Sequence, residues 1–311
     1  MSRFPHTSAA VWPAIPAGRF AAGIQTSNHT GCRVALLGLP DDLGVKLNSG
    51  RPGAAHGPTA FRDALSRYGV CDPVGWNWPS VFDAGDVHPV SGNDASALSQ
   101  THQRISEASK AIVQAGLFPI AIGGGHDLTF AFVRGVLDGL GLMGKANGLY
   151  FDAHLDVRET IGSGMPFRRL CEECGVKRLH LHGYSPFVNS REQFTWFQTH
   201  GGRLDPLTVD SDSIQTDPLP PGDLFVSFDM DVFDGSIAPG VSAMNPQGKT
   251  AADLMPHVRA AGASLRVRCF DIMELNPTVD EGGRTSRLAA HVFLTFLRGL
   301  SDRSTWRMAT S

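Results

Sequence analysis

Short apolar runs that alternate with longer amphipathic stretches are the feature that most limits how this chain can fold. The runs are each a few residues long, several are bounded by Gly, Pro or Asp, and this pattern predicts strands. They are Val34–Leu39, Val81–Ala84, Pro119–Ile122, Leu149–Asp152, Leu179–His182, Leu224–Phe228 and Val267–Ile272. The stretches between them have helical periodicity and include Pro58–Tyr68, Ala95–Ala115, Leu128–Leu137 and Ala251–Ala261. The alternation predicts an α/β fold in which helices cover both faces of a mainly parallel sheet.

The first 30 residues differ from the rest of the chain. They are rich in Ala, Pro, Ser and Thr and have no clear periodicity, so we expect residues 1–30 to form an irregular N-terminal arm. No internal repeat, low-complexity tract or linker divides the remainder. With 311 residues, 42% of them hydrophobic, the chain can build one large core, and we expect residues 31–311 to form a single catalytic domain.

Charge and cysteine content exclude several classes of protein. The net charge of −3 and the lack of a basic block argue against nucleic acid or an anionic membrane as a partner. Five scattered cysteines argue against a secreted disulfide framework. Cys171 and Cys174 form a single CxxC, which we interpret as two thiols on one helix rather than a zinc or redox site. Prolines interrupt any apolar segment of a signal peptide, and no apolar stretch approaches the ~20 residues of a membrane span. We expect a cytoplasmic protein.

A glycine run that ends in a histidine follows the predicted strand Pro119–Ile122. It reads Gly123-Gly124-Gly125-His126-Asp127. Glycine allows the sharp turn and close backbone approach that would bring the histidine into a crowded site. The run lacks the GK[ST] and GxGxxG spacings of phosphate-binding loops. Taken alone, it is better explained by a buried histidine whose hydrogen bonds are satisfied.

Two further motifs place acidic residues at the ends of apolar strands. Asp152-Ala153-His154-Leu155-Asp156 follows one of them, and Ser227-Phe228-Asp229-Met230-Asp231 ends another. In extended backbone, side chains two residues apart share a face, so each motif would direct its polar groups to one side. Carboxylates that close raise one another's pKa unless a cation neutralises them. Either motif alone is compatible with a solvated strand edge, but their joint occurrence indicates a metal site.

Together the three motifs supply two imidazoles and four carboxylates: His126, Asp152, His154, Asp156, Asp229 and Asp231. Six ligands exceed what one catalytic metal normally takes, so carboxylates that bridge two ions are the natural arrangement. Oxygen-rich coordination without thiolates favours Mn²⁺ above Zn²⁺, with Fe and Co still open. Two such ions lower the pKa of a bridging water from ~15.7 towards ~7, which predicts hydrolysis by a metal-bridging hydroxide.

GGGH, DAHxD and SFDxD in this order resemble the motifs of the ureohydrolase family, which includes arginase, agmatinase and formimidoylglutamase. The resemblance runs from about Arg33 to Leu300 and takes in Asn48–Ala54 and Asp271–Pro277. It implies a three-layer α/β/α sandwich, two Mn²⁺ per subunit and a homo-oligomer, either trimer or hexamer. It also implies that one ion is held by His126, Asp152, Asp156 and Asp229, and the other by Asp152, His154, Asp229 and Asp231.

Several segments are most similar to those of formimidoylglutamases: 156–158, 163–167, 187–190, 238–243, 274–277 and 283–285. This resemblance implies hydrolysis of the amidine C–N bond of N-formimidoyl-L-glutamate to L-glutamate and formamide, in histidine degradation. It implies that Glu274 lies beside the substrate amidinium, and that Ser163 and Asn189 help to bind substrate. Met165 and Met244 replace a Thr and a Pro of the formimidoylglutamase pattern, which leaves the exact substrate open.

Two of these residues also have simpler explanations. Glu274 ends a predicted buried strand and would need a partner there, for which an arginine such as Arg284 is the structural alternative. Arg158 lies two residues beyond Asp156, so extended backbone would keep it on the metal-facing side. There its guanidinium would bind a carboxylate of the substrate tail. The alternative is an arginine on the surface or one that supports Asp156.

Other functions remain open. An arginase, agmatinase or other guanidine hydrolase would release urea. Arginases carry a histidine a few residues beyond their SG pair, whereas residues 165–168 read Met-Pro-Phe-Arg. A zinc deacetylase shares the architecture and a DxH…D ligand set but relies on two adjacent histidines, which this chain lacks. An inactive metal-binding homologue is less compatible with the complete ligand set.

Overall fold

The computed structural model describes residues 4–71, 78–204 and 219–303. Nine strands form one sheet in the order β1-β3-β2-β4-β9-β8-β5-β6-β7. Only β1 runs antiparallel to its neighbour; every other pairing in the sheet is parallel. The strands are β1 (Thr7–Ser8), β2 (Val34–Leu39), β3 (Val81–Val87), β4 (Phe118–Gly123), β5 (Ala146–Phe151), β6 (Leu179–His182), β7 (Gly202–Leu204), β8 (Asp223–Asp229) and β9 (Val267–Met273).

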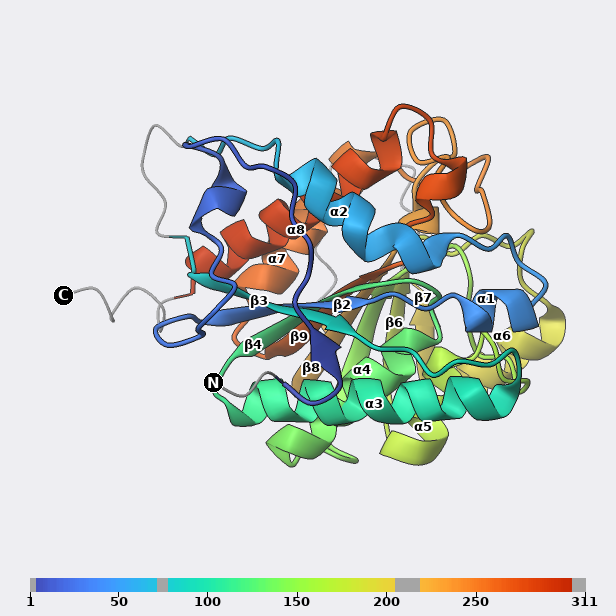
Figure 1. Cartoon of the computed structure of the whole chain (residues 1–311). Helices are drawn as coiled ribbons and strands as arrows, with labels where there is room; N and C mark the ends of the chain where they lie inside the picture. Colours follow the sequence, from blue (N-terminus) through green and yellow to red (C-terminus); the bar gives the residue numbers. More distant parts are fainter. Residues whose placement is uncertain (1–3, 72–77, 205–218, 304–311) are drawn as a thin grey trace.

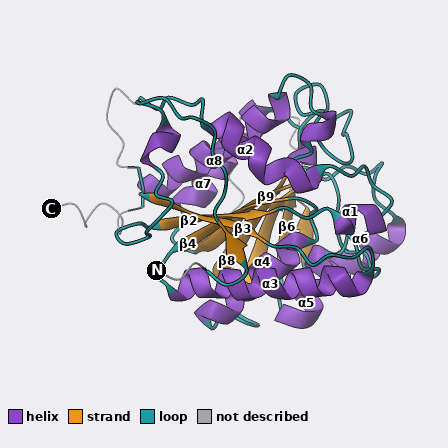
Figure 2. Cartoon of the chain, in the orientation of Figure 1, coloured by secondary structure: helices purple, strands orange, loops and turns teal. Residues whose placement is uncertain are grey.

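Helices cover both faces of this sheet, as Figures 1 and 2 show. The helices α2, α7 and α8 lie over one face, and α3, α4 and α5 lie over the other. Their bounds are α1 (Leu43–Leu47), α2 (Gly57–Leu65), α3 (Ala95–Gln114), α4 (Leu128–Leu140), α5 (Pro166–Cys174), α6 (Arg191–Thr199), α7 (Ala251–Ala263) and α8 (Arg284–Ser301). The 3-10 helices are η1 (Phe20–Gly23), η2 (Ala54–His56), η3 (Met230–Val232) and η4 (Pro277–Val279). The predicted three-layer α/β/α sandwich is confirmed.

The central strands contribute side chains to two apolar cores, one on each face of the sheet. In β2, Val34 and Leu36 belong to the core under α2, α7 and α8, whereas Ala35 and Leu37 belong to the core under α3 and α4. All six residues of β2 are buried. Because both faces are covered, such strands are continuously apolar, which is why their short runs could be recognised in the sequence.

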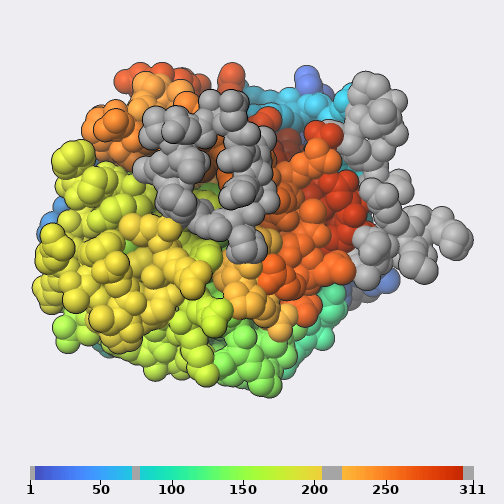
Figure 3. Space-filling view, turned by 180° about the vertical axis from the view of Figure 1, so that it is seen from behind, coloured from blue at the N-terminus to red at the C-terminus, as the bar shows by residue number. Residues whose placement is uncertain are grey.

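Figure 3 shows the molecule from behind, where α6 and β7 (yellow) share one face with α7 (orange).

None of the described helices is both long and apolar enough to cross a membrane. Cys171 and Cys174 both lie in α5, and all five cysteines have free thiols.

The N-terminal arm is not wholly irregular. Residues Thr7 and Ser8 pair with β3, η1 forms one helical turn, and Gln25 bridges Phe82 of β3. The indole of Trp12 donates a hydrogen bond of 2.7 Å to Asp83 in the same strand. The arm therefore follows the edge of the sheet at β3, a contact that its composition did not reveal.

Candidate active site

The predicted site residues come from four strands that are neighbours in the sheet, β4, β9, β8 and β5. His126 follows β4, the DAHxD motif follows β5, the second SFDxD aspartate follows β8, and Glu274 follows β9. The carboxyl ends of parallel strands meet at one edge of the sheet, which is where ligands bind in open α/β folds. The close turn after β4 needs glycine, since a Cβ at Gly124 would lie 1.8 Å from the carbonyl oxygen of Asp41.

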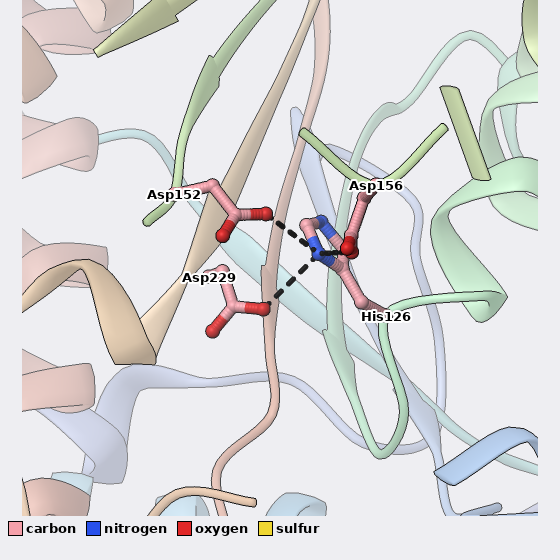
Figure 4. A group of neighbouring side chains, drawn as sticks. All are labelled: His126, Asp152, Asp156 and Asp229. Carbon is pink, nitrogen blue, oxygen red and sulfur yellow. Dashed lines mark ion pairs between the residues drawn. The ribbon is translucent and has the colours of Figure 1, made fainter. Parts of the chain in front are cut away.

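A first group of ligand atoms surrounds the ring of His126, as Figure 4 shows. The Nδ1 atom of His126 lies 3.1 Å from Asp152 Oδ2, 2.9 Å from Asp156 Oδ2 and 3.0 Å from Asp229 Oδ2. One ring nitrogen can bond only one of three such oxygens, and in the described residues Nδ1 has no hydrogen-bond partner. The four side chains therefore turn their ligand atoms towards a common point.

A second group lies beside the first and consists of Asp152, His154 and Asp231. The Nδ1 atom of His154 lies 3.3 Å from Asp152 Oδ1 and 3.0 Å from Asp231 Oδ2. Asp152 presents one oxygen to each group, as a bridging carboxylate would. Asp229 joins only the first group, and its Oδ1 accepts the backbone N–H of Asp231 at 2.7 Å. Its predicted bridging role stays a prediction.

The backbone does not bring these side chains together in the way that we expected. Strand β5 ends at Phe151, so the DAHxD residues follow a turn rather than extended backbone, and Asp231 lies in η3. Asp156 has a φ of +47° and Glu274, just beyond β9, a φ of +63°. Left-handed backbone at non-glycine residues is uncommon and strained, and it clusters at functional sites. Residues 152, 154, 156 and 158 thus reach the same site as expected, but the extended backbone predicted for them was wrong, because local turns aim the side chains instead.

The electrostatics of the cluster call for additional positive charge. Burial, followed by the charges of Asp156 and Asp231, raises the pKa of Asp152 to about 6. Burial also raises the pKa of Asp229 well above its ordinary value, and Asp231 acts in the same direction. Burial by itself lowers the pKa of His126, yet its contacts with Asp152, Asp156 and Asp229 raise it well above normal. Four carboxylates thus exceed the charge that two imidazoles can balance.

The residues present fit divalent cations. Two ligands at right angles around an ion with bonds of ~2.1 Å lie ~3 Å apart, which matches the separations around both imidazoles. Among the described residues, Asp152 Oδ2 and Asp231 Oδ1 are buried without a hydrogen-bond partner, like His126 Nδ1. A buried charge without a partner is costly, and a bound cation would supply the missing partner.

A buried chain of hydrogen bonds orients His126 from behind. Its Nε2 lies 3.0 Å from the hydroxyl of Ser227, which in turn donates to Asp271 Oδ1 at 2.6 Å. This arrangement makes Nε2 the protonated nitrogen and leaves Nδ1 free to bind a metal. Our interpretation of the sequence missed both partners. The signal lay in the pairing of β8 with β9, which aligns Ser227 with Asp271, and strand pairing is not readable from spacing.

Replacing Ser227 by Ala is expected to weaken Mn²⁺ binding about 10- to 100-fold, because His126 loses the group that fixes its tautomer and ring orientation. The dissociation constant of the metal-free protein for Mn²⁺, from equilibrium dialysis, measures this. The matched control is Ser109→Ala, whose buried hydroxyl bonds the carbonyl oxygen of Ile105 inside α3. An unchanged dissociation constant for Mn²⁺ in Ser227→Ala would mean that these hydrogen bonds do not orient His126 for metal binding.

Only one of the two carboxylate oxygens of Glu274 has a hydrogen-bond partner among the described residues. Its Oε1 accepts the backbone N–H of His126 at 2.8 Å, whereas Oε2 is buried without a hydrogen-bond partner in the described residues. Burial raises the pKa of Glu274 to about 7, although the nearby Ser242 hydroxyl and the N–H of His126 act in the opposite direction. The structural alternative, a salt bridge to Arg284, is wrong, because Arg284 pairs with Glu281 and with the carbonyl oxygen of Ser236. Glu274 therefore faces the site with an unpaired oxygen.

A cavity of about 200 Å³ opens onto the metal-ligating groups. Arg158, Ser163 and Glu274 line it with Asn48 and Ser242. Asn189 is not among the lining residues: its amide donates to the carbonyl oxygens of Ala153 and Ser185 and accepts the N–H of Leu155. Both amide hydrogens are thus used to hold the loop that carries His154, so Asn189 shapes the site from outside the cavity.

The two methionines that depart from the formimidoylglutamase pattern also lie outside this lining. Met165 precedes α5 and is buried in the apolar core on the α3 and α4 face. Met244 is 55% exposed. A Cβ at Gly235 would lie 2.4 Å from Met244 Cγ, so the methionine rests against that turn. Neither side chain takes up space beside the ligand groups.

Comparison with known proteins agrees with the site. Residues 32–298 match the model of the Arginase family. The chain belongs to the arginase family. It is 34% identical over 299 residues to a formimidoylglutamase of Aromatoleum aromaticum, covering 87% of this chain and 84% of that protein. A formimidoylglutamase of Aeromonas salmonicida is 31% identical over 280 residues, which cover 83% of this chain and 84% of that protein. The predicted resemblance is confirmed, and the chain is a hydrolase of ureohydrolase type.

Solved structures of the arginase family have the same fold. Bacillus subtilis formimidoylglutamase aligns with a TM-score of 0.82 at 25% identity, over 95% of this chain and 96% of that one. Trypanosoma cruzi formiminoglutamase, crystallised with Mn²⁺, aligns with a TM-score of 0.80 at 28% identity, over 93% of this chain and 100% of that one. Proclavaminate amidino hydrolase of Streptomyces clavuligerus aligns with a TM-score of 0.75 at 26% identity, over 88% of this chain and 93% of that one.

Proposed function

We propose that this chain hydrolyses the amidine C–N bond of N-formimidoyl-L-glutamate and releases L-glutamate and formamide. The observation that carries the proposal is the pairing of two ligand groups with a buried Glu274 whose Oε2 is unpaired, all facing one small cavity. Such a carboxylate suits an amidinium cation, and Arg158 on the cavity lining suits an anionic tail. The formimidoylglutamases among the relatives of the arginase family support the same substrate.

We further propose that the resident metal is Mn²⁺, two ions per subunit. Their proposed ligands are His126, Asp152, His154, Asp156, Asp229 and Asp231. Bound there, two such ions supply a water that is activated for attack on the amidine carbon. The manganese in the T. cruzi formiminoglutamase crystals and the oxygen-rich ligand set of this chain support that identity.

The protein's own residues bind and orient the substrate. Glu274 Oε2 would accept hydrogen bonds from the amidinium and so aim its carbon at the ligand groups. Arg158 and Ser163 would contact the carboxylates of the tail. The complete burial of Asp152 and the near-complete burial of Asp229 and Asp231 shield these carboxylates from bulk water, which strengthens their electrostatic interactions.

The remaining proposals concern the whole protein. Residues 31–311 would form one catalytic domain, a range that the family match at 32–298 supports. We also propose a cytoplasmic enzyme that assembles as a trimer or hexamer. Five free thiols support a reducing compartment.

A substrate panel tests the function. Mn²⁺-loaded protein is incubated with formimidoylglutamate, arginine, agmatine and guanidinobutyrate, and formamide and urea are measured separately. We expect formamide from formimidoylglutamate at the highest kcat/KM. Urea from any of the other three, without formamide, would overturn this substrate in favour of a guanidine hydrolase.

Arg158→Ala is expected to raise the KM for formimidoylglutamate about tenfold to a hundredfold, because a charge-assisted contact is worth ~1.5–3 kcal/mol. Agmatine carries no carboxylate, so the preference of the enzyme for formimidoylglutamate over agmatine should narrow by a similar factor. Arg259→Ala is the control, since Arg259 pairs with Asp302 on the surface. Unchanged selectivity in Arg158→Ala would remove Arg158 from the binding site.

A further inference from the structure

Asn48 connects two of the residues to which we assign substrate binding. Its Oδ1 accepts a short hydrogen bond from Nη1 of Arg158, and its Nδ2 donates to the hydroxyl of Ser163 at 3.1 Å. These residues lie more than a hundred positions away in the sequence, yet all three line the cavity of about 200 Å³. The amide of Asn48 therefore bridges both side chains in the lining of this cavity.

Arg158 has a neutral partner rather than a carboxylate. Among the described residues, the side-chain hydrogen-bond partner of its guanidinium is the amide of Asn48 and not a carboxylate. The side chain also lies against Gly164, where an added Cβ would come within 2.8 Å of Arg158 Cδ. Asn48 and Gly164 thus set the direction of the Arg158 side chain, and neither of them neutralises its positive charge.

The position of Asn48 is itself held by the backbone. Asn48 directly follows α1 as its C-cap, and its N–H donates to the carbonyl oxygen of Gly44 at 3.0 Å. The same oxygen accepts the N–H of Ser163 at 3.0 Å, which ties the end of α1 to the loop that carries Ser163 and Gly164. At the start of α1, Asp42 accepts the N–H of Gly53 at 2.6 Å, which ties the two sides of this segment together. The geometry of Asn48 is therefore built into the fold.

We propose that Asn48 is a positioning residue for Arg158 and thereby sets the preference for substrates with an anionic tail. An amide oxygen fixes the guanidinium without cancelling its charge, so the full charge remains for a substrate carboxylate. An aspartate of the same shape would hold Arg158 equally well but would compete with that carboxylate. The proposal rests on the proposed function, because it assumes that Arg158 binds the substrate tail.

Asn48→Asp tests this directly, because it keeps the shape and the acceptor atom and adds only one negative charge. Two substrates are compared: formimidoylglutamate and its diamide, in which amides replace both carboxylates. We expect the ratio of their kcat/KM values to fall about tenfold to a hundredfold, through a higher KM for the dicarboxylate. The Ki of the product L-glutamate should rise by the same factor. Asn48→Ala, which frees Arg158 without neutralising it, should lower the ratio less.

Asn93→Asp adds the same charge at an exposed position and should leave the ratio at the wild-type value. A purely structural role for Asn48 predicts that Asn48→Asp lowers kcat/KM for both substrates alike; that result, or an unchanged Ki of glutamate, would overturn the proposal. If the wild-type protein releases urea from a guanidino acid instead of formamide, the proposed function fails by itself. The same ratio is then measured with that acid and its amide.

Discussion

Replacing Asp231 by Ala is expected to abolish turnover and to reduce bound Mn²⁺ from about two ions per chain to about one. Asp231 belongs only to the second ligand group, which would keep just Asp152 and His154. Losing the ion of that group removes several kcal/mol of transition-state stabilisation, or at least about a thousandfold in kcat. Metal content by atomic emission and formamide release, measured on the same sample, test both parts.

The fold should survive this substitution. Without metal, Asp231 repels Asp152 and Asp229 but attracts His154, whose Nδ1 lies 3.0 Å from its Oδ2, so its removal relieves a repulsion and loses an attraction that offset each other. We therefore expect metal-free Asp231→Ala to unfold at nearly the same temperature as metal-free wild type. Asp138→Ala, at an exposed aspartate paired with Lys110, is the control for loss of a carboxylate. Two bound ions and substantial turnover in Asp231→Ala would contradict the ligand assignment.

The layers of this fold could be predicted because its central strands are buried on both faces. The bounds of β2 and β6 were predicted to the residue, and α3 to within one residue. The edge strands β1 and β7 have two and three residues and no fully buried side chain, so no apolar run revealed them. A strand that is buried on both faces is a continuous apolar run that can be recognised in the sequence, whereas a short edge strand has no such run.

The ligand residues could be named, but the reason for their convergence could not. Spacing suggested extended backbone from Asp152 to Asp156, whereas the structure turns there and Asp156 takes a left-handed φ of +47°. Such a conformation depends on surrounding contacts, for example the N–H of Phe167 bound to the carbonyl oxygen of Asp156. Residue types predicted the chemistry, and tertiary contacts supplied the geometry.

The hydrogen-bond partners that orient the site residues could not be predicted from the sequence. Ser227 meets Asp271 through the pairing of β8 with β9, and Asn48 meets Arg158 through two loops 110 residues apart. The sequence suggested Asn189 as a contact to substrate, yet it serves the loop that carries His154. An amide side chain can bind substrate or hold a loop, and only its neighbours in the structure distinguish the two roles.

Glu274→Gln is expected to lower kcat/KM for formimidoylglutamate about 100- to 1000-fold, the usual effect of losing one preorganised charged group in a buried site. Gln can still accept the N–H of His126 through its remaining oxygen, so the turn after β4 should keep its shape. Its amide nitrogen, however, would meet the amidinium donor to donor. The substitution thus replaces an attractive contact by a repulsive one and leaves every proposed metal ligand in place.

Metal content decides how a slow Glu274→Gln variant is interpreted. We expect two Mn²⁺ per chain as in wild type, because Glu274 belongs to neither ligand group. Glu281→Gln makes the same chemical change at an exposed carboxylate that pairs with Arg284, and it should keep wild-type kcat/KM. Loss of metal together with activity would mean that Glu274 acts through the N–H of His126. A wild-type kcat/KM with full metal would show that the unpaired Oε2 does not bind the amidinium, and the orientation of substrate would then fall to Arg158 and Ser163 alone.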